Sequence, residues 1–135
     1  MPEESSEEQQ QKAIVFQLLQ QRLEELRAHG TMVETTYAQT DSTYTGLGAL
    51  AGLKNGEEIL VNLGSGIFSK ASAADISAVL VNVGSGIFTE KSVEEAKKFL
   101  AERKQELEKA GERLSEEMGN VAEAMNRIIE ELQKQ

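Results

Sequence analysis

The stretch that decides the fold is "LVNLGSGIFSK" at residues 60–70, because nearly the same phrase, "LVNVGSGIFTE", returns at residues 80–90. In each copy an apolar run with a period of two meets Gly-Ser-Gly and continues as Ile-Phe, followed by polar residues. Two such runs about a short glycine-containing connection are typical of a β-hairpin. The repeat therefore predicts two β-hairpins, linked by "ASAADIS" at residues 71–77.

A phosphate-binding role for the two Gly-Ser-Gly turns is the obvious alternative. A dinucleotide-binding fingerprint needs a third glycine, and Ser69 and Thr89 stand at that position in the two copies. An aromatic strand follows each turn, instead of a helix whose N-terminus would receive the phosphate. We interpret these glycines as turn residues.

A heptad pattern precedes the repeat. Apolar or aromatic residues recur at spacings of three and four from Phe16 to Leu47, interrupted only by Gly30 and Thr40. This seam predicts a helix over about 6–54 that pairs along its length with another helix, opened by a capping box at Ser5 or Ser6. Threonines make the stretch after Gly30 a poor helix former, and propensity alone favours strand there. We expect the unbroken seam to decide for helix, held more weakly near Gly30.

A second helix is predicted over about 92–133. Ser92 and Glu95 form a capping box, and apolar residues then recur at intervals of seven: Leu100, Leu107, Leu114, Val121 and Ile128. The two helices have similar lengths, so folding them back on each other buries both seams. We expect one α+β domain over residues 1–135, a long antiparallel α-helical coiled-coil hairpin with two β-hairpins (about 57–90) at its bend.

The four short strands are too few to cover both faces of a sheet. Their apolar faces and free edges would invite association, so we expect the hairpins to oligomerise into a β-barrel with other subunits. The residues expected to mediate this are apolar residues of both copies: Ile59, Val61, Leu63, Ile67, Phe68, Val79, Val81, Val83, Ile87 and Phe88.

Composition excludes several classes of function. A net charge of −9 argues against nucleic-acid binding, and no apolar run approaches the roughly 20 residues of a membrane span. The first residues lack the features of a signal peptide, and the absence of cysteine removes thiolate metal sites, so we expect a cytoplasmic protein. With His29 as the only histidine and no nucleophile–base pair, we expect no enzyme, no metal and no cofactor.

The stretch "VNVGSGIFTEKSVEEAKKFL" at residues 81–100 closely resembles the α class of the prefoldin family, and the resemblance extends over nearly the whole chain. Two departures are Asn62, where proline is common in the family, and Ser69 and Thr89, near which an aliphatic residue is common. The resemblance implies a hexamer of two α and four β subunits, joined through β-barrels. It also implies an ATP-independent holdase whose coiled-coil tips hold non-native proteins and pass them to a group II chaperonin.

An antiparallel pairing of the helices brings both chain ends to one distal tip, where apolar residues exceed what a seam needs. We expect the substrate-binding residues there: Ile14, Val15, Leu18, Met125, Ile129 and Leu132. Alternatively, they form a broad tip core or pack against a neighbouring subunit. The acidic run Glu3, Glu4, Glu7 and Glu8 is either a solvated helix start or a contact for basic residues of a chaperonin. A structural coiled-coil adaptor or filament protein that holds no clients is the alternative function.

Overall fold

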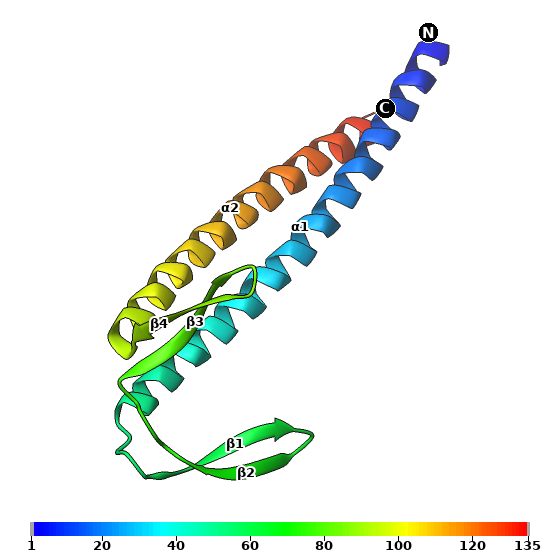
Figure 1. Ribbon diagram of the computed structural model, residues 1–135. Helices are drawn as coiled ribbons and strands as arrows, with labels where there is room; N and C mark the ends of the chain where they lie inside the picture. Colours follow the sequence, from blue (N-terminus) through cyan, green and yellow to red (C-terminus); the bar gives the residue numbers. More distant parts are fainter. Residues whose placement is uncertain (1, 135) are drawn as a thin grey trace. The chain divides into compact units, whose positions relative to one another are not determined.

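The computed structural model describes residues 2–134 of the chain, with side chains from residue 6 onward. The order of elements is α1 (Pro2–Ala51), β1 (Glu58–Gly64), β2 (Ile67–Ser72), β3 (Ala78–Gly84), β4 (Ile87–Ser92) and α2 (Val93–Gln133) (Figure 1). Two antiparallel β-hairpins thus lie between two long helices in the order of the chain, which confirms the predicted α+β fold class. The chain divides into two compact units: unit 1 holds Met1–Tyr37 and Glu106–Gln135, and unit 2 holds Ala38–Gln105.

The heptad seam of α1 is confirmed position by position. Each seam residue from Phe16 to Leu47 is buried or half-buried, including Gly30 and Thr40, while almost all residues between them are exposed. The threonine-rich stretch is helical throughout. Hydroxyl groups there donate to the backbone carbonyl four residues earlier, as Thr36 does to Met32 at 2.8 Å. Pairing along the seam therefore overrides the low helix propensity of this stretch.

The start of α1 differs from the sequence-based expectation. The helix begins at Pro2, so Ser5 and Ser6 lie inside it and the predicted capping box does not open it. Proline suits the first turn because the backbone N–H that it lacks would have no partner within the helix. The helix ends at Ala51, and a turn follows in which the Lys54 N–H donates to Glu57 Oε2 at 2.9 Å.

The start of α2 agrees with its predicted cap. The backbone N–H of Glu95 donates to Ser92 Oγ at 3.1 Å. This bond satisfies one of the N–H groups that the first turn of a helix leaves without a partner. Because β4 ends at Ser92 and α2 begins at Val93, the last strand runs into the helix without a loop.

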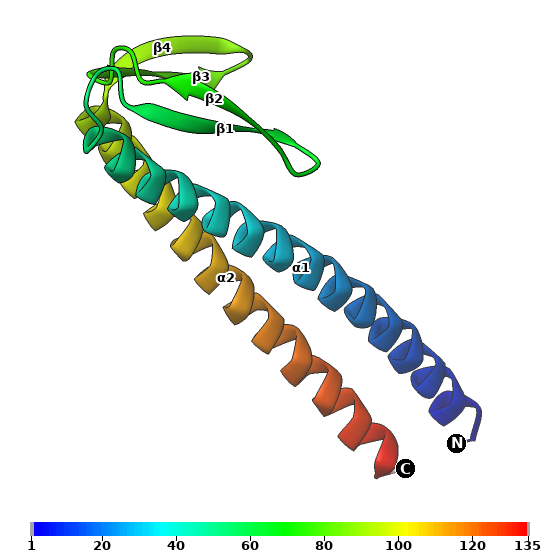
Figure 2. The same cartoon turned by 90° about the horizontal axis from the view of Figure 1, so that it is seen from below.

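Unit 1 is a pair of antiparallel helical segments. Its core is formed by Leu26, Leu114 and Val121, against which the partly buried residues Leu19, Leu23, Val33, Met118 and Met125 pack. An ion pair joins Lys12 to Glu131 at 3.2 Å, and Arg22 hydrogen-bonds to Glu117, so the segments run in opposite directions. Both views show these parts of α1 and α2 running alongside each other (Figure 2).

Unit 2 contains two separate two-stranded sheets, β1–β2 and β3–β4, each antiparallel. The first hairpin is extended beyond its strands, because the Gly56 N–H donates to the Ala73 carbonyl at 2.7 Å and the Ala73 N–H donates to the Glu57 carbonyl. Ala73, Val93 and Ala96 are the buried apolar residues of this unit. Such small side chains bury little area, so the strands expose most of their apolar surface.

Candidate interaction surfaces

The two hairpin turns have the same unusual backbone. Ser65 and Gly66 have φ angles of 54° and 78°, and Ser85 and Gly86 have φ angles of 51° and 74°. Positive φ at both central residues is the requirement of a type I′ turn, whose twist matches that of antiparallel strands. The glycines are therefore turn residues, as the sequence predicts. The serines adopt the left-handed region at some cost, since they carry a Cβ atom.

Each hairpin also carries a bulge next to its turn. The register passes from Asn62–Phe68 to Gly64–Ile67 and skips one residue, and the second hairpin shifts between Asn82 and Gly84 in the same way. The Asn62 side chain accepts a hydrogen bond from the Gly64 N–H at 2.9 Å. The Asn62 side chain thus provides a hydrogen-bond acceptor for a backbone N–H at the bulge, where the pairing between the strands is interrupted.

The register defines one face on each hairpin that carries a leucine, a phenylalanine and a charged residue opposite the leucine; in the first hairpin Glu58 lies on this face as well. In the first hairpin Leu60 lies opposite Lys70, and Phe68 lies opposite Asn62, on the same face because side chains alternate along a strand. We call Leu60, Phe68 and Lys70 the first open face. Leu60 is 64% exposed and Phe68 57% exposed, so this apolar surface is uncovered.

The second hairpin repeats this arrangement. Leu80 lies opposite Glu90, and Phe88 lies opposite Asn82. Leu80 is 71% exposed and Phe88 60% exposed. We call Leu80, Phe88 and Glu90 the second open face. Exposed apolar patches of this kind commonly mark interaction sites.

The reverse side of the second hairpin is partly covered. Val79 and Val81 are half-buried and line a groove of about 270 Å³ together with Phe99 and Leu100 of α2. The matching residue of the first hairpin, Val61, is exposed. The two hairpins thus have similar sequences but different surroundings.

The predicted oligomerisation residues therefore fall into two groups. Seven are exposed, namely Val61, Leu63, Ile67, Phe68, Val83, Ile87 and Phe88, and three are half-buried, namely Ile59, Val79 and Val81. Sequence reasoning missed Leu60 and Leu80, although both side chains are highly exposed. It followed the β-branched alternation along β1 and β3, so it included Phe68 and Phe88 of the open faces but left out Leu60 and Leu80 on the same faces. Leu60 shares a face with Phe68, and Leu80 with Phe88, only in the register that the bulge produces, and the sequence alone does not show that register.

The predicted substrate-binding residues, which lie near the two ends of the chain, also fall into an exposed group and a half-buried group. Ile14, Val15, Leu18 and Ile129 are exposed, and Ile14 and Leu18 reach 58%. Met125 and Leu132 are half-buried in the α2 seam, and Met125 packs against the core of unit 1. The spacing of Ile14 and Leu18, one helical turn apart, places them on the same side of α1.

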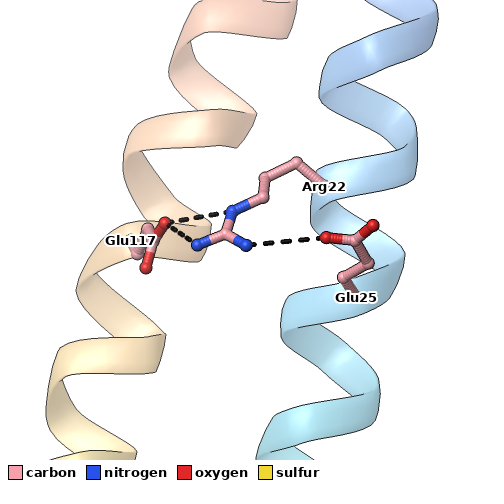
Figure 3. A network of polar contacts seen from close by, with 3 residues as sticks. All are labelled: Arg22, Glu25 and Glu117. Carbon is pink, nitrogen blue, oxygen red and sulfur yellow. Dashed lines mark hydrogen bonds and ion pairs between the residues drawn. The ribbon is translucent and has the colours of Figure 1, made fainter.

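Polar contacts hold the two segments of unit 1 in register. Arg22 Nε donates to Glu117 Oε1 at 3.1 Å, and Arg22 Nη1 lies 3.5 Å from Glu25 Oε2 (Figure 3). The hydrogen bond with Glu117 raises the pKa of Arg22 above its ordinary value. Further along, the Tyr37 hydroxyl donates to Glu108 at 3.0 Å. The Arg22 and Glu117 side chains remain about half exposed, so their ion pair specifies alignment more than stability.

In unit 2 a tyrosine lies between two lysines. The Nζ atoms of Lys97 and Lys104 each lie 5.2 Å from the centre of the Tyr44 ring, and Lys104 also pairs with Asp41 at 2.7 Å. Cation–π contacts of this length hold the α1 and α2 segments of the unit together.

The part of the chain that the structure describes holds neither a cluster suited to a metal ion nor a helix suited to a membrane. Among residues 2–134 no group of three or more His, Asp or Glu side chains is placed to hold a metal ion. His29 is exposed on α1. No helix in that range combines the length and the apolar character that crossing a bilayer requires.

Comparison with known proteins gives concordant results. Residues 19–135 match the family model described as "Prefoldin subunit". The chain is 32% identical to the prefoldin subunit alpha of Thermofilum pendens over 113 residues, which covers 84% of this chain and 88% of that protein. It is 34% identical to the prefoldin subunit alpha of Methanocorpusculum labreanum over 119 residues, covering 88% and 76%.

A solved structure shares the fold. It is described as the cryo-EM structure of filamentous PFD from Methanocaldococcus jannaschii, and it matches with a TM-score of 0.76 and 24% identity. The match covers 86% of this chain and 96% of that one. At this identity the likeness concerns the arrangement of helices and hairpins alone.

Proposed function

The chain belongs to the prefoldin family, in its α class, and from this premise we propose that it is an ATP-independent holdase. In this proposal it captures non-native proteins at the tip of unit 1 and delivers them to a group II chaperonin in the cytoplasm. Both units act together as one prefoldin-type domain over residues 1–135. The observation that carries the proposal is the exposure of four aliphatic side chains near the two ends of the chain, Ile14, Val15, Leu18 and Ile129, in addition to the seam residues.

Assembly is the first part of the proposal. The open faces and the other exposed residues of the hairpins become buried in β-barrels, as two copies of this chain join four β-class subunits. The support is the amount of exposed apolar surface on two-stranded sheets, which are marginal in water without a partner.

Client capture is the second part. The exposed aliphatic side chains of the tip bind apolar segments of unfolded chains without sequence preference. Each contact contributes on the order of 1–2 kcal/mol, so holding a client requires several tips at once. Met125 and Leu132 are half-buried, so in this proposal they contribute less to capture than the exposed residues. A hexamer supplies the necessary number of tips.

Delivery to a chaperonin is the third part. Nearly all of the net charge of −9 falls in the sequence ranges of unit 1. Glu7 and Glu8 are exposed near the start of α1, whereas the side chains of Glu3 and Glu4 lie outside the described residues. In the proposal, this acidic end meets basic residues of the chaperonin, in an interaction that added salt weakens.

The test compares tip variants with a matched control in the reconstituted complex with β-class subunits. We expect Ile14→Ser, Leu18→Ser and Ile129→Ser together to abolish most protection of chemically denatured citrate synthase against aggregation, with the mass of the particle unchanged. The control is Met32→Ser, because Met32 is a 68% exposed apolar residue on α1 outside the tip. Full protection by the triple variant would refute client capture at the tip. Saturable binding of one stoichiometric partner would instead favour the structural adaptor.

A further inference from the structure

Within the repeated phrases the two hairpins differ in one chemically important way, and the flanking strand positions add two more charge differences, Glu58 against Ala78 and Ala71 against Lys91. Between residues 60–70 and 80–90 only three positions change, and two of these exchange similar residues. The third replaces Lys70 by Glu90 and so reverses the charge. The reversal occurs in two hairpins that share the same turn residues, the same bulge position and the same Ile-Phe pair after the turn.

The structure places these two charges at equivalent points. Lys70 lies opposite Leu60 and Glu90 lies opposite Leu80, so each charge sits on an open face beside an exposed leucine. The Lys70 side chain is 82% exposed, and its contact with Glu58 is long, at 3.8 Å. The position of Glu58 is occupied by Ala78 in the second hairpin, and Glu90 has no ion pair among the residues that the structure describes.

We propose that Lys70 and Glu90 are the specificity-determining residues through which the first hairpin of one copy meets the second hairpin of another copy. The inference rests on the barrel assembly of the proposed function and names which hairpins pair within it. The occupant of each open face is the unlike open face of a second copy. Leucine and phenylalanine of the two faces meet, and Lys70 of one copy pairs with Glu90 of the other.

A two-fold axis between the two copies satisfies both hairpins of each copy, so no open face is left for a third copy. When the first hairpin of one copy contacts the second hairpin of its partner, the two-fold axis creates the same contact a second time. Pairing of like hairpins would place Lys70 beside a second Lys70, and Glu90 beside a second Glu90. Such juxtaposed like charges disfavour the wrong register, while the apolar residues supply most of the affinity.

The expected size of the effect follows from exposed ion pairs. Each contributes up to about fivefold to an association constant, so two symmetric pairs contribute up to about 25-fold. Salt at about 1 M shortens the Debye length to about 3 Å and should remove most of this factor. The effect is therefore a preference between partners, which a competition experiment measures best.

The test uses reconstituted particles with β-class subunits, in which isotope-labelled and unlabelled copies of this chain compete. Native mass spectrometry then counts particles that hold two labelled, two unlabelled or mixed copies. A mixture of Lys70→Glu and Glu90→Lys chains should give an excess of mixed particles over the statistical 1:2:1 distribution, because only mixed pairs form both ion pairs. Wild-type chains mixed with the double variant Lys70→Glu/Glu90→Lys should sort into unmixed particles.

The second mixture separates the two pairing schemes. If like hairpins met, wild-type and doubly reversed chains would form an excess of mixed particles, which overturns the proposal. Statistical distributions in both mixtures at low salt also overturn it. Glu58→Gln is the control for the contact within the first hairpin, and it should leave the sorting unchanged. Particles without two copies of this chain would contradict the proposed assembly itself, which is a different result.

Discussion

Gly111 of α2 lies against Val33 of α1, so that a methyl group added to Gly111 would meet Val33 Cγ1 at 4.0 Å. That distance is an ordinary van der Waals contact. The two residues line an open groove of unit 1 together with Tyr37 and Leu107. Glycine at this point leaves the helix pair underfilled where the seam continues on both sides.

We expect Gly111→Ala to raise the free energy of unfolding by about 1 kcal/mol or slightly more, through helix propensity plus the added contact. Gly119→Ala is the matched control, since a methyl group there meets nothing within 4 Å and gains propensity alone. Urea unfolding of both variants measures the difference. A smaller gain at Gly111 than at Gly119 would mean that the groove is not free to accept a methyl group.

The core of unit 1 should respond very differently from its tip. Leu26→Ala removes a side chain that is 2% exposed, and we expect a loss of about 2–4 kcal/mol. Leu18→Ala, eight residues earlier on the same helix, removes an exposed side chain and should change stability by less than about 0.5 kcal/mol. Thermal unfolding of the two variants checks this. Comparable losses would show that Leu18 is covered and unsuited to bind clients.

The turn of the first hairpin should discriminate between backbone conformations. Gly66→Ala forces a Cβ atom into a φ of 78°, and we expect the hairpin to lose about 1 kcal/mol although space is open there. Ser65→Asn creates the Asn-Gly pair that type I′ turns favour and should stabilise it slightly. Hydrogen exchange of the β1 and β2 amides reports both changes. Equal protection in the alanine variant would argue against a type I′ turn.

The link between the hairpins should respond to acid. Asp75 accepts hydrogen bonds from the Ser77 hydroxyl at 2.6 Å and the Ser77 N–H at 2.9 Å, which lower the pKa of its carboxyl below 3.8. A lowered pKa means that the turn is fully stabilised above the ordinary value and loses this stabilisation as pH falls through the lowered one.

An NMR titration between about pH 2 and 6 checks this through the Ser77 amide and the Asp75 carboxyl carbon. Asp75→Asn keeps an acceptor oxygen but cannot titrate, so its Ser77 amide should not follow pH over this range. A midpoint at or above 3.8 in the wild-type chain would contradict the hydrogen-bonded geometry.

Much of the fold could be predicted because heptads and hairpins are local patterns. The α1 seam holds even at Gly30 and Thr40, where the residue types themselves are unfavourable. The prediction for the start of α1 was wrong, since a proline at the first turn began the helix before the expected serine caps. Capping signals compete with one another, and a sequence does not rank them.

The candidate sites were predicted less completely. A heptad position states which side of a helix faces its partner, and it could have separated the seam residues Met125 and Leu132 from the exposed Ile14 and Leu18. The residues of a two-stranded sheet carry no such information. Alternation shows that a hairpin has two faces, but not which one another element covers.

The sequence by itself therefore determined the two helices with their apolar seams, the two hairpins and their turns, because each depends on neighbours within a few residues along the chain. Only the tertiary structure decided that Val79 and Val81 are half-buried at a groove that Phe99 and Leu100 also line, while the Leu80 side chain, opposite Glu90, stays exposed. Exposure depends on what packs from distant parts of the chain, and that packing is set by long-range contacts that no local pattern contains.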